Sequence, residues 1–276
     1  MKLDVNERLK ELRLPGVKDC YKEMANMARR ESLSYEQYLS EVLEREWEER
    51  RNRRIERMLR ASKLPLEKNL ESFDRKRLPM KVDALVSMLL EGMFLEHSEN
   101  VLTFGTPGGG KSHLLCAIGQ EMIYLGWRIL FKPCEMLVQE LLAAKRDLKL
   151  PQALKQLGRY DGLIIDDIGY VQQSREEMEV LFTLLAHRYE RKSVMLTSNL
   201  AFSEWEKIFR DPMTTAAAID RLVHHSVILE LNLPSYRLEE AKKRGVESIE
   251  VGEEGGKGEK IFITSPRGEV MNEREL

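Results

Sequence analysis

The sequence has no apolar run long enough to span a bilayer, and its first ten residues, MKLDVNERLK, lack the apolar segment of a signal peptide. Both absences favour a cytoplasmic protein. Cysteine is scarce as well. The three cysteines, Cys20, Cys116 and Cys134, match the spacing of neither a disulfide framework nor a metal site. We therefore expect three free thiols, as in a reducing cytosol.

A large excess of charge of either sign is also missing. The 44 basic and 46 acidic residues give a formal net charge of −2 at pH 7. This balance excludes a uniformly basic coat for nucleic acid, although it leaves room for a local basic patch. Internal repeats are absent. The 276 residues are enough for one sizeable domain and a smaller one.

The first part of the chain, residues 1–63, predicts a small domain made only of helices. Pro15 and Gly16 end a first helix, and Ser34 is placed to cap the last one, in which Tyr38, Val42 and Trp47 recur at helical spacing. Residues 48–60 of that helix hold six arginines and three glutamates. They fit either a solvated helix with local ion pairs or a surface for phosphates or an acidic partner.

Residues 64–81, with two prolines and no sustained period, predict an ordered linker into a second domain at 82–245. There, apolar strands alternate with helices, which predicts an α/β fold whose five-stranded parallel sheet is covered by helices on both faces. Residues 246–276 are rich in glycine and glutamate and predict a flexible tail. The expected strands are residues 100–105, 127–132, 162–166, 193–199 and 227–231.

The segment GTPGGGKS, residues 105–112, matches the phosphate-binding loop G-x-x-x-x-G-K-[ST] and stands between a predicted strand and helix. A glycine-rich loop turns its N–H groups inward, and the following helix adds the positive end of its dipole. Lys111 would reach the β- and γ-phosphates of ATP, and Ser112 would offer its hydroxyl to Mg²⁺. Alternatively, the glycines only form a tight turn between the strand and the helix. The candidate nucleotide-binding residues are Gly105, Thr106, Pro107, Gly108, Gly109, Gly110, Lys111, Ser112 and His113.

Two adjacent carboxylates, Asp166 and Asp167, end the apolar strand GLIIDD. Unpaired charges at the end of a buried strand are costly, but a magnesium ion with a triphosphate would offset that cost. Asp166 would hold the metal, and Asp167 would orient or deprotonate the attacking water. Alternatively, Asp167 only caps the turn before Gly169.

Asn199 follows the next strand, in the segment TSN. An asparagine there is by itself a turn signal. Beside a phosphate-binding loop and a paired acid, it could instead sense the γ-phosphate and position the same water.

The order of GTPGGGKS, LIIDD, TSN, AAAIDRL and PSYR resembles the AAA+ ATPases of the IstB/DnaC group. The helical segments LRLPGVKDCYKEM and LSYEQYLSEVLEREWEERRNRRIERMLRASKLP are most similar to the IstB-like transposition helper ATPases. The resemblance covers roughly residues 8–244. It implies a P-loop AAA+ core and two further site residues. Arg221 in AIDRL corresponds to an arginine finger that enters the neighbouring subunit's site, and Arg237 corresponds to the sensor 2 arginine that contacts the γ-phosphate in cis.

Two positions depart from the pattern of that family. The loop has glycines where relatives usually carry a threonine or serine, with Ser112 where many have threonine. Asp167 stands where a glutamate is the more usual base, although an aspartate there is common in IstB-like proteins. The first change keeps the nest and the hydroxyl, so binding should survive. The shorter Asp167 side chain could slow hydrolysis.

The resemblance implies a slow ATPase that forms homo-oligomers, as a ring or spiral, on duplex DNA. It would remodel or select target DNA and recruit the transposase of the same mobile element. A DnaC-type helicase loader on single-stranded DNA shares the same core and is the main alternative, although the helical domain argues against it. A third class is an adaptor that binds ATP and never hydrolyses it. A metabolic kinase fits poorly, because no lid or second-substrate motif is present.

Two smaller features of the sequence are a basic cluster and a pair of adjacent histidines. Lys145, Arg146 and Lys149 form a basic cluster that could face DNA in an assembly, or simply be a solvated helix end. His224 and His225 have no further ligand at metal-site spacing, so we expect a structural role for them.

Overall fold

The computed structural model describes residues 4–169, 174–205 and 212–236. Arg237 and the predicted tail at 246–276 lie outside these residues. The described chain begins with three helices: α1 (Val5–Glu11), α2 (Pro15–Glu31) and α3 (Tyr35–Ser62). Ser34 caps α3 as expected, because its hydroxyl accepts the Gln37 N–H while the Gln37 side chain accepts the Ser34 N–H.

The side chain of Glu46 on α3 is hydrogen-bonded to the first turn of α2. Its buried carboxylate accepts the Val17 N–H at 3.1 Å and the Arg50 Nε–H at 2.7 Å. A Cβ at Gly16 would lie 3.0 Å from the same carboxylate, so only glycine fits there without a shift. Burial raises the pKa of Glu46, but the bonds from Arg50 and Val17 outweigh it and hold the pKa below its ordinary value.

Replacing Glu46 by glutamine should lower the free energy of unfolding by about 2 kcal/mol at pH 7, because charge-assisted hydrogen bonds to a buried carboxylate are lost. A lowered folded-state pKa stabilises the fold above the ordinary pKa of 4.5. That contribution is lost as the pH falls below 4.5 and through the lowered value, so the difference between variant and wild type should shrink over that range. Urea unfolding followed by circular dichroism at several pH values measures it.

Glu49→Gln is the matched control, because Glu49 also pairs with an arginine four residues on but is exposed. An exposed pair contributes little, so its effect should stay below about 1 kcal/mol. Equal losses in both variants would contradict the role given to Glu46.

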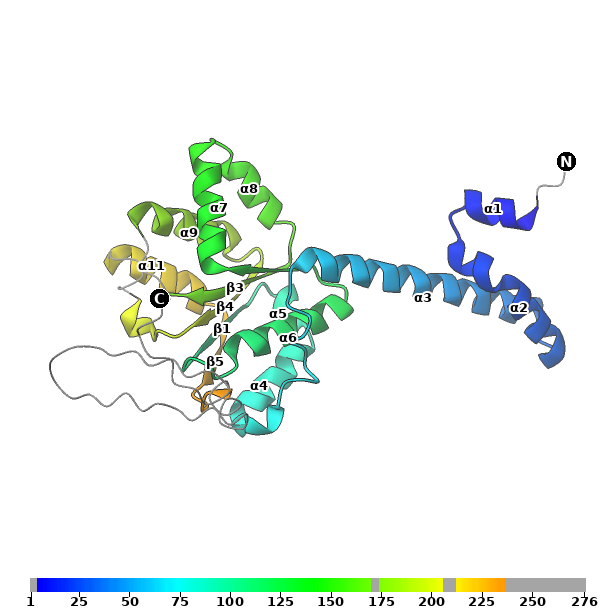
Figure 1. Ribbon diagram of the computed structural model, residues 1–276, viewed down its shortest axis with the longest axis horizontal. Coiled ribbons are helices and arrows are strands. Elements are labelled where there is room, and N and C mark those ends of the chain that lie inside the picture. Colours follow the sequence, from blue (N-terminus) through cyan, green and yellow to red (C-terminus); the bar gives the residue numbers. More distant parts are fainter. Residues whose placement is uncertain (1–3, 170–173, 206–211, 237–276) are drawn as a thin grey trace, which may run out of the picture. The chain divides into compact units, whose positions relative to one another are not determined.

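A five-stranded sheet forms the centre of the second part of the chain (Figure 1). Its strand order is β2-β3-β4-β1-β5, and every pair is parallel. This confirms the predicted α/β fold. The strands are β1 (Asn100–Gly105), β2 (Ile129–Pro133), β3 (Gly162–Ile168), β4 (Ser193–Ser198) and β5 (Ser226–Leu231).

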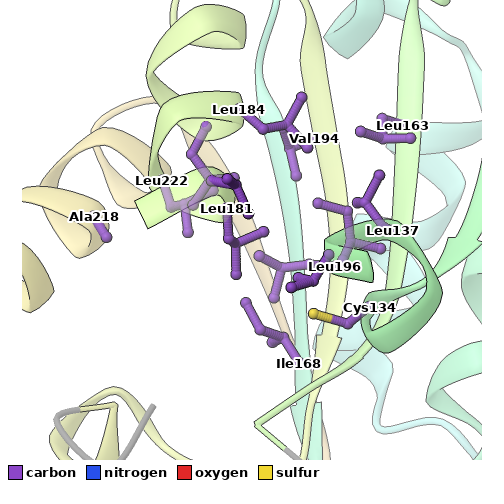
Figure 2. Packing of buried hydrophobic residues seen from close by; sticks show 14 of the residues in the cluster. Cys134, Leu137, Leu163, Ile168, Leu181, Leu184, Val194, Leu196, Ala218 and Leu222 are labelled. Carbon is purple, nitrogen blue, oxygen red and sulfur yellow. The ribbon is translucent and has the colours of Figure 1, made fainter. Parts of the chain in front are cut away.

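Helices cover both faces of the sheet, which explains why the strands are almost continuously apolar. On β3, Leu163 and Ile165 join one buried cluster, while Ile164 between them joins the other. Figure 2 shows the first cluster, where Leu163 and the β4 residues Val194 and Leu196 meet side chains from the helices on that face. The helices around the sheet are α4 (Met80–Leu90), α5 (Met93–Glu96), α6 (Lys111–Tyr124), α7 (Cys134–Arg146), α8 (Leu150–Leu157), α9 (Arg175–Arg188) and α11 (Pro212–Val223).

The segment between α3 and α4 packs against α6. The side-chain amide of Gln120, which is buried, donates to the carbonyls of Pro65 and Lys68 at 3.2 and 3.0 Å. The short 3₁₀ turn Arg75–Arg77 follows, capped by Asp74. These contacts bring the segment close to the first turn of α6, where the phosphate-binding loop ends.

The three cysteines are free thiols, as expected. Burial raises the pKa of the Cys116 thiol to about 12, so this side chain is an apolar core residue at neutral pH. No helix in the described part of the chain combines the length and the apolar character that crossing a membrane requires.

Candidate nucleotide-binding site

The loop from Gly105 to Gly110 joins β1 to α6 and has a backbone that requires glycine. Gly105 and Gly108 have φ angles of 144° and 79°. A Cβ on Gly105 would lie 2.1 Å from the Leu231 carbonyl oxygen, and one on Gly108 would lie 2.1 Å from the Ser235 hydroxyl. The loop is therefore a close-fitting curve of backbone rather than a loose turn.

The residues after β5 hold this loop from one side. The Thr106 hydroxyl donates to the Leu233 carbonyl at 2.9 Å, and the Tyr236 N–H donates to the Gly108 carbonyl at 3.1 Å. A cavity of about 250 Å³ lies against the loop and is lined by residues 107–113, Asp167, Asn199, Phe73 and Tyr236. The N-terminus of α6 lies at this cavity, which places the positive end of a 14-residue helix there.

Lys111 brings the loop and the end of β4 together. It is only 5% exposed, and its ammonium donates to the carbonyls of Gly105 and Thr106, both at 2.9 Å. The same ammonium donates to Asn199 Oδ1 at 2.5 Å. Asn199, 88 residues along the chain, thus meets the lysine of the loop directly.

The two adjacent carboxylates lie at a bulge in β3. Ile165 pairs with Leu196 and Ile168 with Ser198, so Asp166 and Asp167 together stand opposite the single residue Thr197. Asp167 has a φ of 59°, in the left-handed region that few residues other than glycine adopt. In a regular strand, neighbouring side chains point to opposite faces. The bulge relaxes that rule for this pair.

Thr197 fixes both members of the pair. Its buried hydroxyl donates to Asp166 Oδ1 at 2.6 Å and accepts the Asp167 backbone N–H at 2.8 Å. Asp167 is exposed and lines the cavity, whereas Asp166 is half-buried. Sequence reasoning gave Thr197 no role, although a threonine that opens the segment TSN at the end of a buried strand was a usable signal.

Aromatic residues from two distant segments complete the cavity, and sequence reasoning missed both. Phe73 packs edge-on against His113, with 5.2 Å between ring centroids. The Arg77 guanidinium lies 5.5 Å from the Tyr236 ring centroid and donates to the Pro234 carbonyl at 3.0 Å. Tyr236 belongs to the segment PSYR, but a role for its ring in the cavity, like that of Phe73, follows only from the path of the folded chain.

His113, the last residue of the predicted set, faces the segment before α4. Its Nε2 lies 3.1 Å from both the Ser72 hydroxyl and the Asn69 carbonyl. His113 thereby ties the start of α6 to the segment that carries Phe73.

Arg221 and the basic cluster, two other predicted features, do not line this cavity. Arg221, on α11, stacks its guanidinium 4.6 Å from the Phe182 ring centroid, and Arg237 lies outside the described residues. The basic cluster is partly neutralised: Lys145 pairs with Glu179 at 2.8 Å and Lys149 with Asp147 at 3.5 Å. Arg146, in the same cluster, is exposed at the end of α7.

The fold brings Glu190 to His224 and His225, so that one ligand atom from each of the three side chains lies within 4.8 Å of the others. The structural role expected for the two histidines stays a prediction. All three side chains are exposed, and His224 Nδ1 lies 3.2 Å from the Tyr189 hydroxyl. The sequence could not show this proximity, since Glu190 belongs to a different turn.

The donor set around the loop fits a triphosphate with magnesium. Backbone N–H groups, a helix N-terminus and a buried ammonium are donors suited to phosphate oxygens. The Ser112 hydroxyl and the carboxylates are the oxygen ligands that Mg²⁺ prefers. The family described as IstB-like ATP binding protein matches residues 7–244. The chain belongs to this family.

Named relatives place the IstB-like chain beside proteins of insertion sequences. It is 46% identical over 230 residues to an insertion sequence ATP-binding protein of Sinorhizobium fredii, covering 83% of this chain and 77% of the relative. It is 41% identical over 224 residues to the ATP-binding protein of insertion sequence IS21 of Pseudomonas aeruginosa, covering 81% and 84%. An ATP-binding role for the cavity agrees with these names.

Solved structures share the fold of this IstB-like protein. The DnaC helicase loader superimposes with a TM-score of 0.53 at 18% identity, covering 60% of this chain and 97% of that one. DnaA from Aquifex aeolicus, bound to AMPPCP, gives 0.52 at 19% identity, covering 68% and 59%. At such identities the likeness shows the fold alone.

Proposed function

We propose that this IstB-like protein is a slow ATPase that assists transposition by assembling on duplex DNA. The observation that supports it most is the meeting of Lys111, Asn199 and Asp167 at one cavity beside the phosphate-binding loop. A loop that only turned the chain would need neither a buried ammonium nor an acid in a left-handed conformation. Family membership adds the link to insertion sequences.

Residues of the cavity divide the binding of MgATP among them. The N–H groups of residues 107–112 and the Lys111 ammonium bind the phosphates. Ser112 of the cavity and Asp166, beside Asp167 at the bulge, would hold Mg²⁺, which would neutralise charge on the phosphate oxygens. The Thr197 hydroxyl keeps Asp166 oriented. Phe73 and Tyr236 offer apolar and aromatic surface for the base, in reach of the same cavity.

Hydrolysis depends on Asp167 and Asn199. Asp167 lines the cavity, and its backbone is fixed by Thr197, so its carboxylate can accept a proton from an attacking water. Asn199 contacts the lysine that binds the γ-phosphate, which suits it to orient that water and report on the phosphate. In this proposal Arg237 contacts the γ-phosphate in cis, and Arg221 enters the neighbouring subunit's site.

In this proposal, ATP binding and hydrolysis control the assembly of subunits on DNA. ATP between subunits supports a ring or spiral on duplex DNA, which selects or remodels the target and recruits the transposase of the same element. Hydrolysis then releases the complex. The division of the chain into a helical domain (1–63), a linker (64–81), an ATPase domain (82–245) and a tail (246–276) stays a prediction.

Measuring the mass of the particles that the protein forms tests the proposed function. Mass photometry of the full chain should give large assemblies only with ATP and duplex DNA together, and small particles with ADP. Avidity in the assembly would offset weak DNA binding by each subunit. Assembly on single-stranded DNA alone would favour the helicase-loader alternative instead. Identical particles with ATP and ADP would contradict nucleotide-controlled assembly altogether.

A further inference from the structure

The C-terminal half of α3 separates its charges onto two faces. Arg50, Arg51, Arg54 and Arg57 follow one another at spacings that place them on the same side as Trp47. Glu48, Glu49 and Glu56 lie on another side of the helix, and two of them pair with arginines outside this row. Glu48 pairs with Arg45 at 3.5 Å, and Glu49 pairs with Arg53 at 2.7 Å.

Three of these four arginines have no acidic partner among the residues that the structure describes. Arg50 pairs with Glu46, whereas Arg51, Arg54 and Arg57 belong to none of the ion pairs found there. Arg51 and Arg54 each donate one bond, at the limiting distance of 3.5 Å, to the carbonyls of Tyr124 and Gly126. A guanidinium has five N–H donors, so most of each exposed side chain remains available for a ligand.

This face lines a groove whose other side is the turn from α6 to β2. Two cavities, of about 310 and 550 Å³, lie along it and share Arg54, Met58 and Gly126. We call this surface the arginine groove: Trp47, Arg50, Arg51, Arg54, Arg57 and Arg128. Among the described residues, the one acid that lines it is Asp161, whose carboxylate pairs with Lys192 at 2.6 Å and with Arg128 of the groove at 3.7 Å. The groove therefore carries a clear excess of positive charge.

We propose that the arginine groove binds the sugar-phosphate backbone of duplex DNA. The proposal rests on the proposed function, which supplies DNA as the ligand, and it identifies the surface. One guanidinium group can donate two parallel hydrogen bonds to two oxygens of a phosphate, and it is weakly hydrated. Arginine therefore suits this contact better than lysine. The exposed indole of Trp47, with Arg51 at 5.7 Å from its ring centroid, adds flat apolar surface beside the charges.

The geometry favours a regular polyanion over an acidic protein segment. Arg50 to Arg57 spans about 10 Å of helix, over which one strand of B-DNA presents roughly three phosphates. Arg50, Arg51, Arg54 and Arg57 place four cations along that length, enough for one at each phosphate. By contrast, the cluster of Lys145, Arg146 and Lys149 is less suited to phosphates, because two of its three cations are bonded to acids.

Salt dependence of binding tests the assignment. Fluorescence anisotropy with a labelled duplex, and with a non-hydrolysable ATP analogue present, gives the slope of log affinity against log salt concentration. Each phosphate contact contributes about 0.9 to that slope, so R51A/R54A/R57A should reduce it by about 2.7. When salt is raised from 50 to 200 mM, the factor by which affinity falls should then be about 40 times smaller for the variant than for wild type.

Two matched variants serve as controls. K145A/R146A/K149A removes the same number of positive charges and should keep the wild-type slope. R51K/R54K/R57K preserves the charges and should also keep most of the slope, which separates phosphate binding from a role in packing α3. Thermal unfolding monitored by circular dichroism shows whether α3 remains folded in each.

Each outcome decides something. A slope that falls only in the alanine variant of the arginine groove supports the proposal. A wild-type slope in that variant overturns it and leaves the proposed function standing. Wild-type protein that binds no duplex would overturn both. If the variant keeps duplex binding but loses binding of a labelled polyglutamate probe, the groove is a surface for an acidic protein, and the assignment to DNA is wrong.

Discussion

Replacing Arg221 by alanine is expected to leave ATP bound and to reduce turnover by at least about 10³-fold, because an arginine finger contributes about 10³–10⁵ to the rate of phosphoryl transfer. The structure gives this arginine a support that can present it outward. Its guanidinium rests on Phe182, and the Asn100 side chain donates to the Leu222 carbonyl at 3.0 Å, fixing the end of α11. No ion pair between described residues involves Arg221.

The same substitution should remove assembly with ATP on duplex DNA, as measured by mass photometry. Arg191→Ala, which changes an exposed arginine in the turn after α9, is the control and should behave as wild type. Nucleotide affinity, measured with a fluorescent ATP analogue, should be unchanged in both. Normal turnover and assembly in the Arg221 variant would remove the finger role.

Mixing two inactive variants distinguishes action in trans from action in cis. Subunits with Arg221→Ala keep their own Asp167, and subunits with Asp167→Asn keep their own Arg221. If the arginine enters the neighbouring site, the mixture should recover a fraction of wild-type turnover. If Arg221 acts within its own subunit, no site in the mixture is complete and turnover stays at background.

The fold was predictable because its signals are local. The strands are short apolar runs between helices of amphipathic pattern, and Gly105 to Ser112 match a motif whose flanks are a strand and a helix. On α6, Leu114, Leu115, Ile118 and Met122 recur at helical spacing and are fully buried. Leu125 follows at the same spacing, but α6 ends at Tyr124 and the side chain of Leu125 is 56% exposed.

The candidate site was predictable only where its residues belong to motifs. Phe73 and Tyr236 reach the loop through the segment before α4 and the segment after β5, and no periodicity connects them. The bulge at Asp166 and Asp167 depends on how β3 pairs with β4, which a single strand does not encode. The function of a charge cluster is ambiguous for the same reason. The sequence does not show that Lys145 will pair with an acid in the fold, whereas Arg51 pairs with none among the described residues.

Replacing Asp167 by asparagine is expected to reduce turnover by about 10²–10⁴-fold while ATP binding is retained, because a positioned general base contributes about that factor. The substitution is close to isosteric. Asparagine also tolerates the left-handed conformation at φ 59°, and the backbone N–H that Thr197 accepts is unchanged. The bulge should therefore persist, and the change isolates the loss of a proton acceptor from any loss of structure.

The consequence for assembly follows from slow hydrolysis. If hydrolysis releases the complex, the Asp167→Asn variant should form assemblies on duplex DNA with ATP that outlast those of wild type, as followed by mass photometry over time. Asp147→Asn, at an exposed acid after α7, serves as the control for turnover and should match wild type. Unchanged turnover in the Asp167 variant would place the base elsewhere. Lost turnover with assemblies of ordinary lifetime would instead separate hydrolysis from release, and disassembly would then depend on exchange of nucleotide rather than on its cleavage.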